Sequence, residues 1–158
     1  QLIENLANVD GFTVRFVGKG PSAETLQKAA QSLNARNVSF EGFYPKEKEK
    51  DYVKNATFMN IYYPRKASHD TALSNRFYNS LIYGKPMITT ANTTQGDYAS
   101  DYGVGLALEN CNNLPNALTN YLNRMDVAQY IENRRKLLND FLLDYNEWER
   151  ILRKFLEN

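Results

Sequence analysis

The sequence predicts an α/β fold, a Rossmann-like parallel sheet of about five to six strands with helices on both faces. Three observations support this prediction. Apolar, β-rich runs alternate with amphipathic runs of helical spacing. The segments that follow the β-rich runs are polar or glycine-rich, whereas those that lead into them are short turns. The length of 158 residues suits one substantial core, so we expect a single domain over residues 1–158.

The predicted strands are rich in β-branched and aromatic residues and are bounded by turn residues. The first, FTVRFV, ends at the glycines of GKGP, and the third, TFMNIYY, ends just before Pro64. The five strands are predicted over residues 12–17, 38–41, 57–63, 86–90 and 104–109.

The predicted helices place apolar residues three and four positions apart. A short helix at Leu2 to Leu6 opens the chain, and Gly84 ends the helix that carries Leu73, Phe77, Leu81 and Ile82 on its core face. The helices after the first are predicted over residues 23–33, 46–54, 73–83, 114–124, 127–143 and 146–156.

The last predicted helix lies within YNEWERILRKFLEN and gathers apolar residues on one face. That face, with Trp148, Ile151, Leu152 and Phe155, needs a cover. Either this domain's own sheet or a second domain outside the chain would provide it.

Composition excludes several kinds of function. Nineteen basic residues against eighteen acidic ones give a formal charge of +1, which is not the basic face of a nucleic-acid-binding protein. Cys111 is the only cysteine and His69 the only histidine, so an intrachain disulfide and a multi-histidine or cysteine metal site are excluded. No apolar run reaches membrane-spanning length.

The polar segments after the strands are the candidate site. They are Gly18 to Pro21, Gly42 to Tyr44, residues 65–75 and residues 89–98. In an open parallel sheet these segments lie along one edge, where such folds bind ligands. We therefore expect them to form one site.

Each part of this candidate site has a structural alternative. The GKGP segment is either a tight turn or a close backbone approach to a sugar or phosphate. Asn75 and Asn79 lie one helical turn apart beside Arg76, at a helix start that favours a phosphate, unless Ser74 or Thr71 caps that helix without a ligand.

Two further pairs are weighed in the same way. His69 and Asp70 are either a general acid/base pair or two solvent-facing residues. Phe43 and Tyr44 leave the second strand at the binding edge, where an aromatic ring could stack on a base, although most aromatic residues of the chain serve the core.

An ordered set of segments resembles the C-terminal, donor-binding half of GT-B-fold group 1 glycosyltransferases, the type common in bacterial polysaccharide synthesis. The set is FTVRFVGKGP, NVSFEGF with DYVKNATFMNIYY, LSNRFYNSLIYGKPMITT and GVGLALE, closed by a helix with a tryptophan. It covers residues 12–156.

The resemblance implies a donor-binding site and leaves the catalytic residues unassigned. Glycines and a lysine flank the donor, two aromatic residues border its base, and backbone N–H groups at a helix start meet the diphosphate. The family has two glutamates eight residues apart, but Thr71 and Asn79 stand there in this chain, and an amide binds a ribose hydroxyl less strongly than a carboxylate does. The implied residues are Gly18, Lys19, Phe43, Tyr44, Thr71, Ser74, Asn75, Arg76 and Asn79.

The implied function is transfer of a glycosyl group from a nucleotide-activated sugar to an acceptor hydroxyl, of the hexosyltransferase type, in polysaccharide or glycoconjugate synthesis. The partners are the nucleotide sugar, an acceptor saccharide or lipid-linked saccharide, and an N-terminal acceptor domain that the chain lacks, so we expect the chain alone to be inactive. No cofactor, metal, nucleic acid or transmembrane segment is expected. The implied location is cytoplasmic, free or peripheral at the inner membrane face. The alternative is a non-catalytic Rossmann-like nucleotide-binding or scaffolding module.

Overall fold

The computed structural model describes residues 1–157 and divides the chain into two compact units. The first unit comprises Gln1–Ala56 and Leu108–Met125, and the second comprises Thr57–Ala107 and Asp126–Asn158. Each unit is described by itself. Both combine parallel strands with helices, so the predicted α/β class is confirmed.

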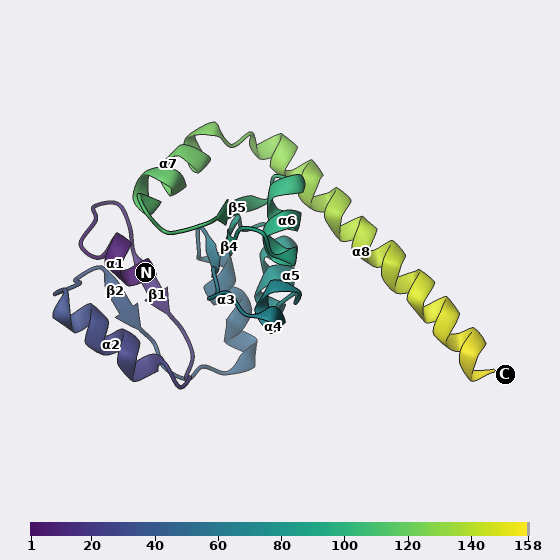
Figure 1. Ribbon diagram of the computed structural model, residues 1–158, viewed down its shortest axis with the longest axis horizontal. Helices are drawn as coiled ribbons and strands as arrows, with labels where there is room; N and C mark the ends of the chain where they lie inside the picture. Colours follow the sequence, from purple (N-terminus) through teal and green to yellow (C-terminus); the bar gives the residue numbers. More distant parts are fainter. Residues whose placement is uncertain (158) are drawn as a thin grey trace. The chain divides into compact units, whose positions relative to one another are not determined.

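The first unit is built around two short parallel strands. β1 (Val14–Phe16) pairs with β2 (Val38–Phe40) in the register Val14–Val38, and the Phe16 and Phe40 rings stack at 5.0 Å. The helices, drawn in Figure 1, are α1 (Leu2–Leu6), α2 (Ala23–Ser32), the 3-10 turn η1 (Lys46–Lys48), α3 (Glu49–Lys54) and α7 (Leu114–Arg124).

Its core is made by apolar residues from each of the longer segments, namely Ile3, Leu6, Val14, Ala30, Val53, Cys111, Leu114 and Leu118. The Asn37 side chain fastens the entry to β2, because its amide donates to the carbonyls of Leu6 and Phe12 at 2.8 and 2.9 Å. These hydrogen bonds therefore stabilise the amino-terminal end of the β1–β2 pair, and the loops that follow the two strands begin at its carboxyl end.

The second unit contains a three-stranded sheet in the order β3-β4-β5. β3 (Met59–Ile61) and β4 (Met87–Thr90) are parallel, with Met59 opposite Met87, and β5 is Gly105–Leu108. The helices are α4 (Ala67–Asp70), α5 (Asn75–Tyr83), α6 (Thr94–Asp101) and α8 (Val127–Leu156). Figure 1 shows α5 and α6 side by side along this sheet, with the first part of α8 running past them.

Phe77 and Leu81 of α5 are fully buried, as their spacing predicted, whereas Ile82 is 56% exposed. The α5 helix ends at Gly84, whose φ of +66° lies in the left-handed region that glycine adopts without strain. The Arg134 guanidinium of α8 donates to the Leu81 carbonyl at 3.0 Å and so caps the same end.

The elements differ from the prediction in several respects. The predicted 65–75 loop contains the short helix α4, and α5 begins at Asn75, so Leu73 lies before the helix instead of on its core face. The strands are shorter, and within residues 1–157 they form sheets of two and three strands instead of one sheet of five to six. Part of the predicted 89–98 loop is the helix α6, which begins where Thr93 Oγ1 accepts the Gly96 N–H at 3.1 Å. The two predicted terminal helices are one helix, α8, since residues 143–146 contain neither proline nor glycine to interrupt it.

Candidate functional site

The loops that leave β1 and β2 meet at the carboxyl ends of these strands. The Glu41 N–H donates to the Phe16 carbonyl at 2.8 Å, and the Gly18 N–H donates to the Gly42 carbonyl at 2.7 Å. These bonds continue the strand pairing by two residues and bring the glycine-rich segment beside the aromatic one. A sheet of parallel strands presents its ligand-binding residues at this end.

The two loops line an open pocket of about 420 Å³, which we call the β1–β2 pocket. It is lined by Gly18, Lys19, Phe43, Tyr44, Lys46 and Glu49. Four of these six are residues that the sequence singled out, and they come from both loops. The structure therefore brings Gly18, Lys19, Phe43 and Tyr44 together.

Gly18 shapes the floor of the β1–β2 pocket. Its φ of +110° is one that L side chains rarely adopt, so the backbone itself requires glycine there. Crowding is not the reason, because a Cβ atom would meet only the Tyr44 ring, at 3.8 Å. The backbone at Gly18 is consequently open to approach by a ligand.

The aromatic side of the β1–β2 pocket has one exposed ring and one braced ring. Phe43 is 76% exposed, so most of its ring is open to solvent. Tyr44 packs edge-on against Tyr52, with the ring centres 5.2 Å apart. A hydrogen bond to Glu41 raises the pKa of Tyr52, and Glu41 also pairs with Arg15 at 2.9 Å.

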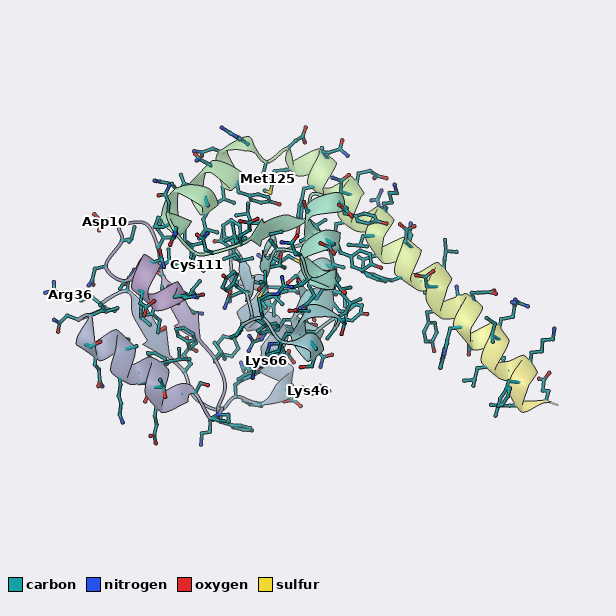
Figure 2. The ribbon with its side chains drawn as sticks, in the orientation of Figure 1. Asp10, Arg36, Lys46, Lys66, Cys111 and Met125 are labelled. Carbon is teal, nitrogen blue, oxygen red and sulfur yellow. The ribbon has the colours of Figure 1, made fainter. Side chains whose placement is uncertain are left out.

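The charged residues of the β1–β2 pocket are two lysines and one glutamate. Lys19 and Lys46 could neutralise an anionic ligand, and Glu49 could accept N–H groups from a polar ring. Lys46 and Glu49 were not among the predicted site residues, because they lie in the predicted helix over residues 46–54 and not in a strand-end loop. They belong to η1 and the first position of α3, directly after the aromatic loop, and Figure 2 marks Lys46 at this turn. Extending the candidate loop by one helical turn would have included both.

The second group of predicted residues lies around the start of α5, in the second unit. Ser74 is the N-cap, and its Oγ accepts the Phe77 N–H at 3.3 Å. Both the N–H and the hydroxyl of Ser74 donate to Oε1 of the buried Gln95, at 3.0 and 2.7 Å. The capping alternative is thus confirmed for Ser74, whose N–H already has a protein partner instead of being free for a diphosphate.

The remaining residues of this group differ in exposure. Thr71 donates its hydroxyl to the Ala67 carbonyl at 3.0 Å. Asn75 and Arg76, at the first two positions of α5, are exposed. Asn79 is half-buried and already interacts with a neighbouring group of the protein. Thr71, Asn75 and Arg76 are therefore exposed, although the Thr71 hydroxyl already has a protein acceptor, and Asn79 is half-buried and engaged within the protein.

The segment after β3 satisfies its own polar groups. Arg65 pairs with Asp70 at 3.1 Å and donates to the Ala91 carbonyl at 2.9 Å. The His69 Nδ1 lies 2.8 Å from the Pro64 carbonyl and must carry the proton of that hydrogen bond, because a carbonyl can only accept. Asp70 is thus paired with Arg65 and His69 with Pro64, and the two do not pair with each other.

Two further findings concern the described part of the chain. Residues 1–157 contain no group of three or more histidine, cysteine, aspartate or glutamate side chains placed to hold a metal ion. Among the helices of the same residues, none combines the length and the apolar character that crossing a membrane requires.

Comparison with known proteins found no matching family model, no matching curated protein and no matching solved structure.

Proposed function

We propose that the β1–β2 pocket binds a nucleotide-activated sugar and that the chain is the donor-binding part of a glycosyltransferase with a Rossmann-like fold. The observation that carries this proposal is the meeting of Gly18, Lys19, Phe43 and Tyr44 in one pocket beyond the carboxyl ends of two parallel strands. The transferred glycosyl group would pass to an acceptor hydroxyl, with a nucleoside diphosphate as the leaving group.

The pocket supplies groups for the base and for the diphosphate of a nucleotide. The exposed Phe43 ring offers a face on which a base can stack, and such stacking contributes about 1–3 kcal/mol per base in other proteins. Lys19 and Lys46 supply positive charge for the diphosphate. The volume of about 420 Å³ lies within the range of about 300–1,000 Å³ that is usual for ligand pockets.

The second candidate is a non-catalytic nucleotide-binding or scaffolding module. It is favoured by the second group of residues, because Ser74, Thr71 and Asn79 are engaged within the protein. Such a module would use the β1–β2 pocket without transferring a sugar.

The test is a titration of the chain with UDP, GDP and UDP-sugars, followed by chemical-shift mapping and calorimetry. We expect shifts at Gly18, Phe43 and Tyr44, together with a dissociation constant that Phe43→Ala raises about tenfold through lost stacking. Lys19→Ala should weaken the binding of nucleoside diphosphates more than the binding of nucleosides. Lys28→Ala, which removes an exposed lysine of α2, is the matched control and should leave binding unchanged.

The outcomes separate the two candidates. A lower dissociation constant for a UDP-sugar than for UDP, with additional shifts at the β1–β2 pocket, supports the glycosyltransferase. Binding that is confined to the β1–β2 pocket, with no difference between a nucleotide and its sugar conjugate, supports the binding module. Saturating nucleotide without any shift in the pocket rejects the glycosyltransferase and favours a scaffolding module that binds no nucleotide.

A further inference from the structure

The two halves of α8 have different surroundings. In the first half, Tyr130 and Leu137 are buried, and the Phe141 ring packs against the rings of Phe77, Tyr78 and Tyr98 at 6.1, 5.6 and 5.2 Å. Figure 1 shows the second half of α8 running on beyond α5 and α6. The first four turns of the helix are thus packed against the protein, and nearly all side chains of the remaining turns are exposed to solvent.

The exposed half bears an ordered row of apolar side chains. Tyr145, Trp148, Leu152 and Phe155 continue from Phe141 at spacings of four, three, four and three residues, and we call these four residues the distal stripe. They are between 36% and 77% exposed. Apolar residues at this spacing form the seam by which two helices pair in a coiled coil. Ile151 and Leu156 border the stripe and are also exposed.

Charged residues of the distal half pair along the helix and leave the stripe apolar. Arg150 pairs with Glu147 at 2.6 Å and Arg153 with Glu149 at 2.8 Å. Residues 144–157 contain four acidic and three basic side chains. Helices that lie on anionic membranes carry an excess of lysine and arginine, so the charge of this helix favours a protein partner over a lipid surface.

The charges are unevenly distributed along residues 144–157. Asp144, Glu147 and Glu149 come first, and Arg150, Arg153 and Lys154 follow, with Glu157 as the one acidic residue at the basic end. Two copies of the helix aligned in parallel would set acidic ends side by side. Aligned antiparallel, each acidic end would lie beside the basic end of the other copy, and the helix dipoles would also oppose each other favourably.

We propose that the distal stripe binds the distal stripe of a second copy of this chain, in an antiparallel helix pair. The three aromatic rings of the stripe are each more than half exposed, and an enclosed aromatic side chain buries about 150–250 Å². Two copies would together bury on the order of 1,000 Å², which is the lower limit of a specific interface. The dimer is therefore a weak one, with exchange between monomer and dimer.

The first test measures the mass of the full chain by light scattering and sedimentation over a series of micromolar concentrations. Trp148 is the only tryptophan, so its emission reports burial of the stripe directly and should shift to shorter wavelength as dimer forms. Leu152→Glu should raise the dissociation constant at least tenfold, because the dimer would bury unpaired carboxylates. Since nearly all side chains of α8 from residue 142 onward are exposed, circular dichroism should show an unchanged fold.

Leu143→Glu is the matched control. Leu143 is 66% exposed and lies two residues from Phe141, about 200° around the helix from the stripe. The Leu143→Glu substitution should leave the dissociation constant of the dimer unchanged. A chain that stays monomeric at all concentrations with constant Trp148 emission, or a dimer that both substitutions weaken equally, would overturn the proposal.

The orientation is tested by cysteine cross-linking, for which the buried Cys111 of the unaltered chain supplies the background. A mixture of the Tyr145→Cys variant and the Phe155→Cys variant should form a cross-linked dimer. The Tyr145→Cys variant alone should not, because in an antiparallel pair position 145 of one helix lies opposite position 155 of the other. Efficient cross-linking of Tyr145→Cys alone would indicate a parallel pair and reject the antiparallel one. Anionic vesicles that shift Trp148 emission while the chain remains monomeric would assign the stripe to lipid instead.

Discussion

Two regions that follow strands use similar residues in opposite ways. The loops after β1 and β2 leave Phe43 exposed and two lysines around an open pocket. The segment from β3 to the start of α5 is also polar, but its groups are hydrogen-bonded within the protein. Ser74 binds Gln95, Arg65 binds Asp70 and Ala91, and His69 binds Pro64.

Polarity after a strand does not by itself mark a ligand site. A polar group in such a position is available only if no protein partner reaches it. In the β3–α5 segment the partners come from α6 and from the end of β4, whereas the β1–β2 pocket has an empty volume in front of its side chains. Changes in the β3–α5 segment should therefore affect stability, and changes in the pocket should affect binding.

The largest effect is expected for Gly96→Ala. A Cβ atom at Gly96 would overlap the Thr90 carbonyl oxygen and lie 3.2 Å from Thr93 Oγ1, both of which hold the start of α6. Because backbone has to move to relieve the overlap, the free energy of unfolding should fall by about 3 kcal/mol. Urea unfolding followed by circular dichroism measures it.

Gly20→Ala is the control for this substitution. A Cβ atom at Gly20 would have no atom within 4 Å, so the change in unfolding free energy should stay within about 0.5 kcal/mol. Equal stability of the two variants would mean that the β4–α6 connection is not tightly packed, and the contrast between the two regions would disappear.

A smaller loss is expected for Gln95→Leu. The N–H and hydroxyl of Ser74 would lose their shared acceptor in a buried position, which should cost about 2 kcal/mol of unfolding free energy. Phe43→Ala, in the pocket, removes a ring that is 76% exposed and should cost no more than about 0.5 kcal/mol.

Nucleotide titrations complete this comparison, since Phe43→Ala should weaken binding and Gln95→Leu should not. The reverse pattern, with Phe43 required for folding and Gln95 for binding, would exchange the roles of the two regions.

Much of the fold follows from local sequence patterns. The strand positions, the helices from Leu2 to Leu6 and from Leu114 to Arg124, and the end of α5 at Gly84 were all predicted within a few residues. These elements depend on spacing and on turn residues, which a sequence displays directly. The division of the strands into two sheets was not predicted, because pairing depends on which strands meet in space.

The site was predictable only in part, for the same reason. Glycine and aromatic residues after strands indicated Gly18, Lys19, Phe43 and Tyr44 correctly as neighbours. Gln95 carries no local sign that it binds Ser74, 21 residues earlier, so the sequence could not show that the start of α5 is already occupied. α6 was not predicted because residues 89–98 are polar and follow a strand. Gly96 lies in the first turn of α6, where a side chain would overlap the Thr90 carbonyl.

The smallest predicted effect concerns three tyrosines with raised pKa values. Tyr52 and Tyr121 lie in the first unit and Tyr102 lies in the second. Hydrogen bonds to Glu41 and to Asp140 raise the pKa of Tyr52 and of Tyr102, respectively, because each carboxylate favours the neutral phenol. Burial raises the pKa of Tyr121 to about 12. A phenol whose pKa is higher in the folded state stabilises the protein below its ordinary value of 10.0, and this contribution is lost as the pH rises above it.

Ultraviolet titration of the phenols should accordingly show Tyr52 ionising at lower pH in Glu41→Gln and Tyr102 at lower pH in Asp140→Asn, each without effect on the other or on Tyr121. In Glu41→Gln the unpaired Arg15 would add to the decrease, since its charge favours the phenolate. Tyr52 supports the Tyr44 ring in the wall of the pocket, so Glu41→Gln should also weaken nucleotide binding slightly, whereas Asp140→Asn should not. An unshifted pKa of Tyr52 in Glu41→Gln would contradict the hydrogen bond between Tyr52 and Glu41.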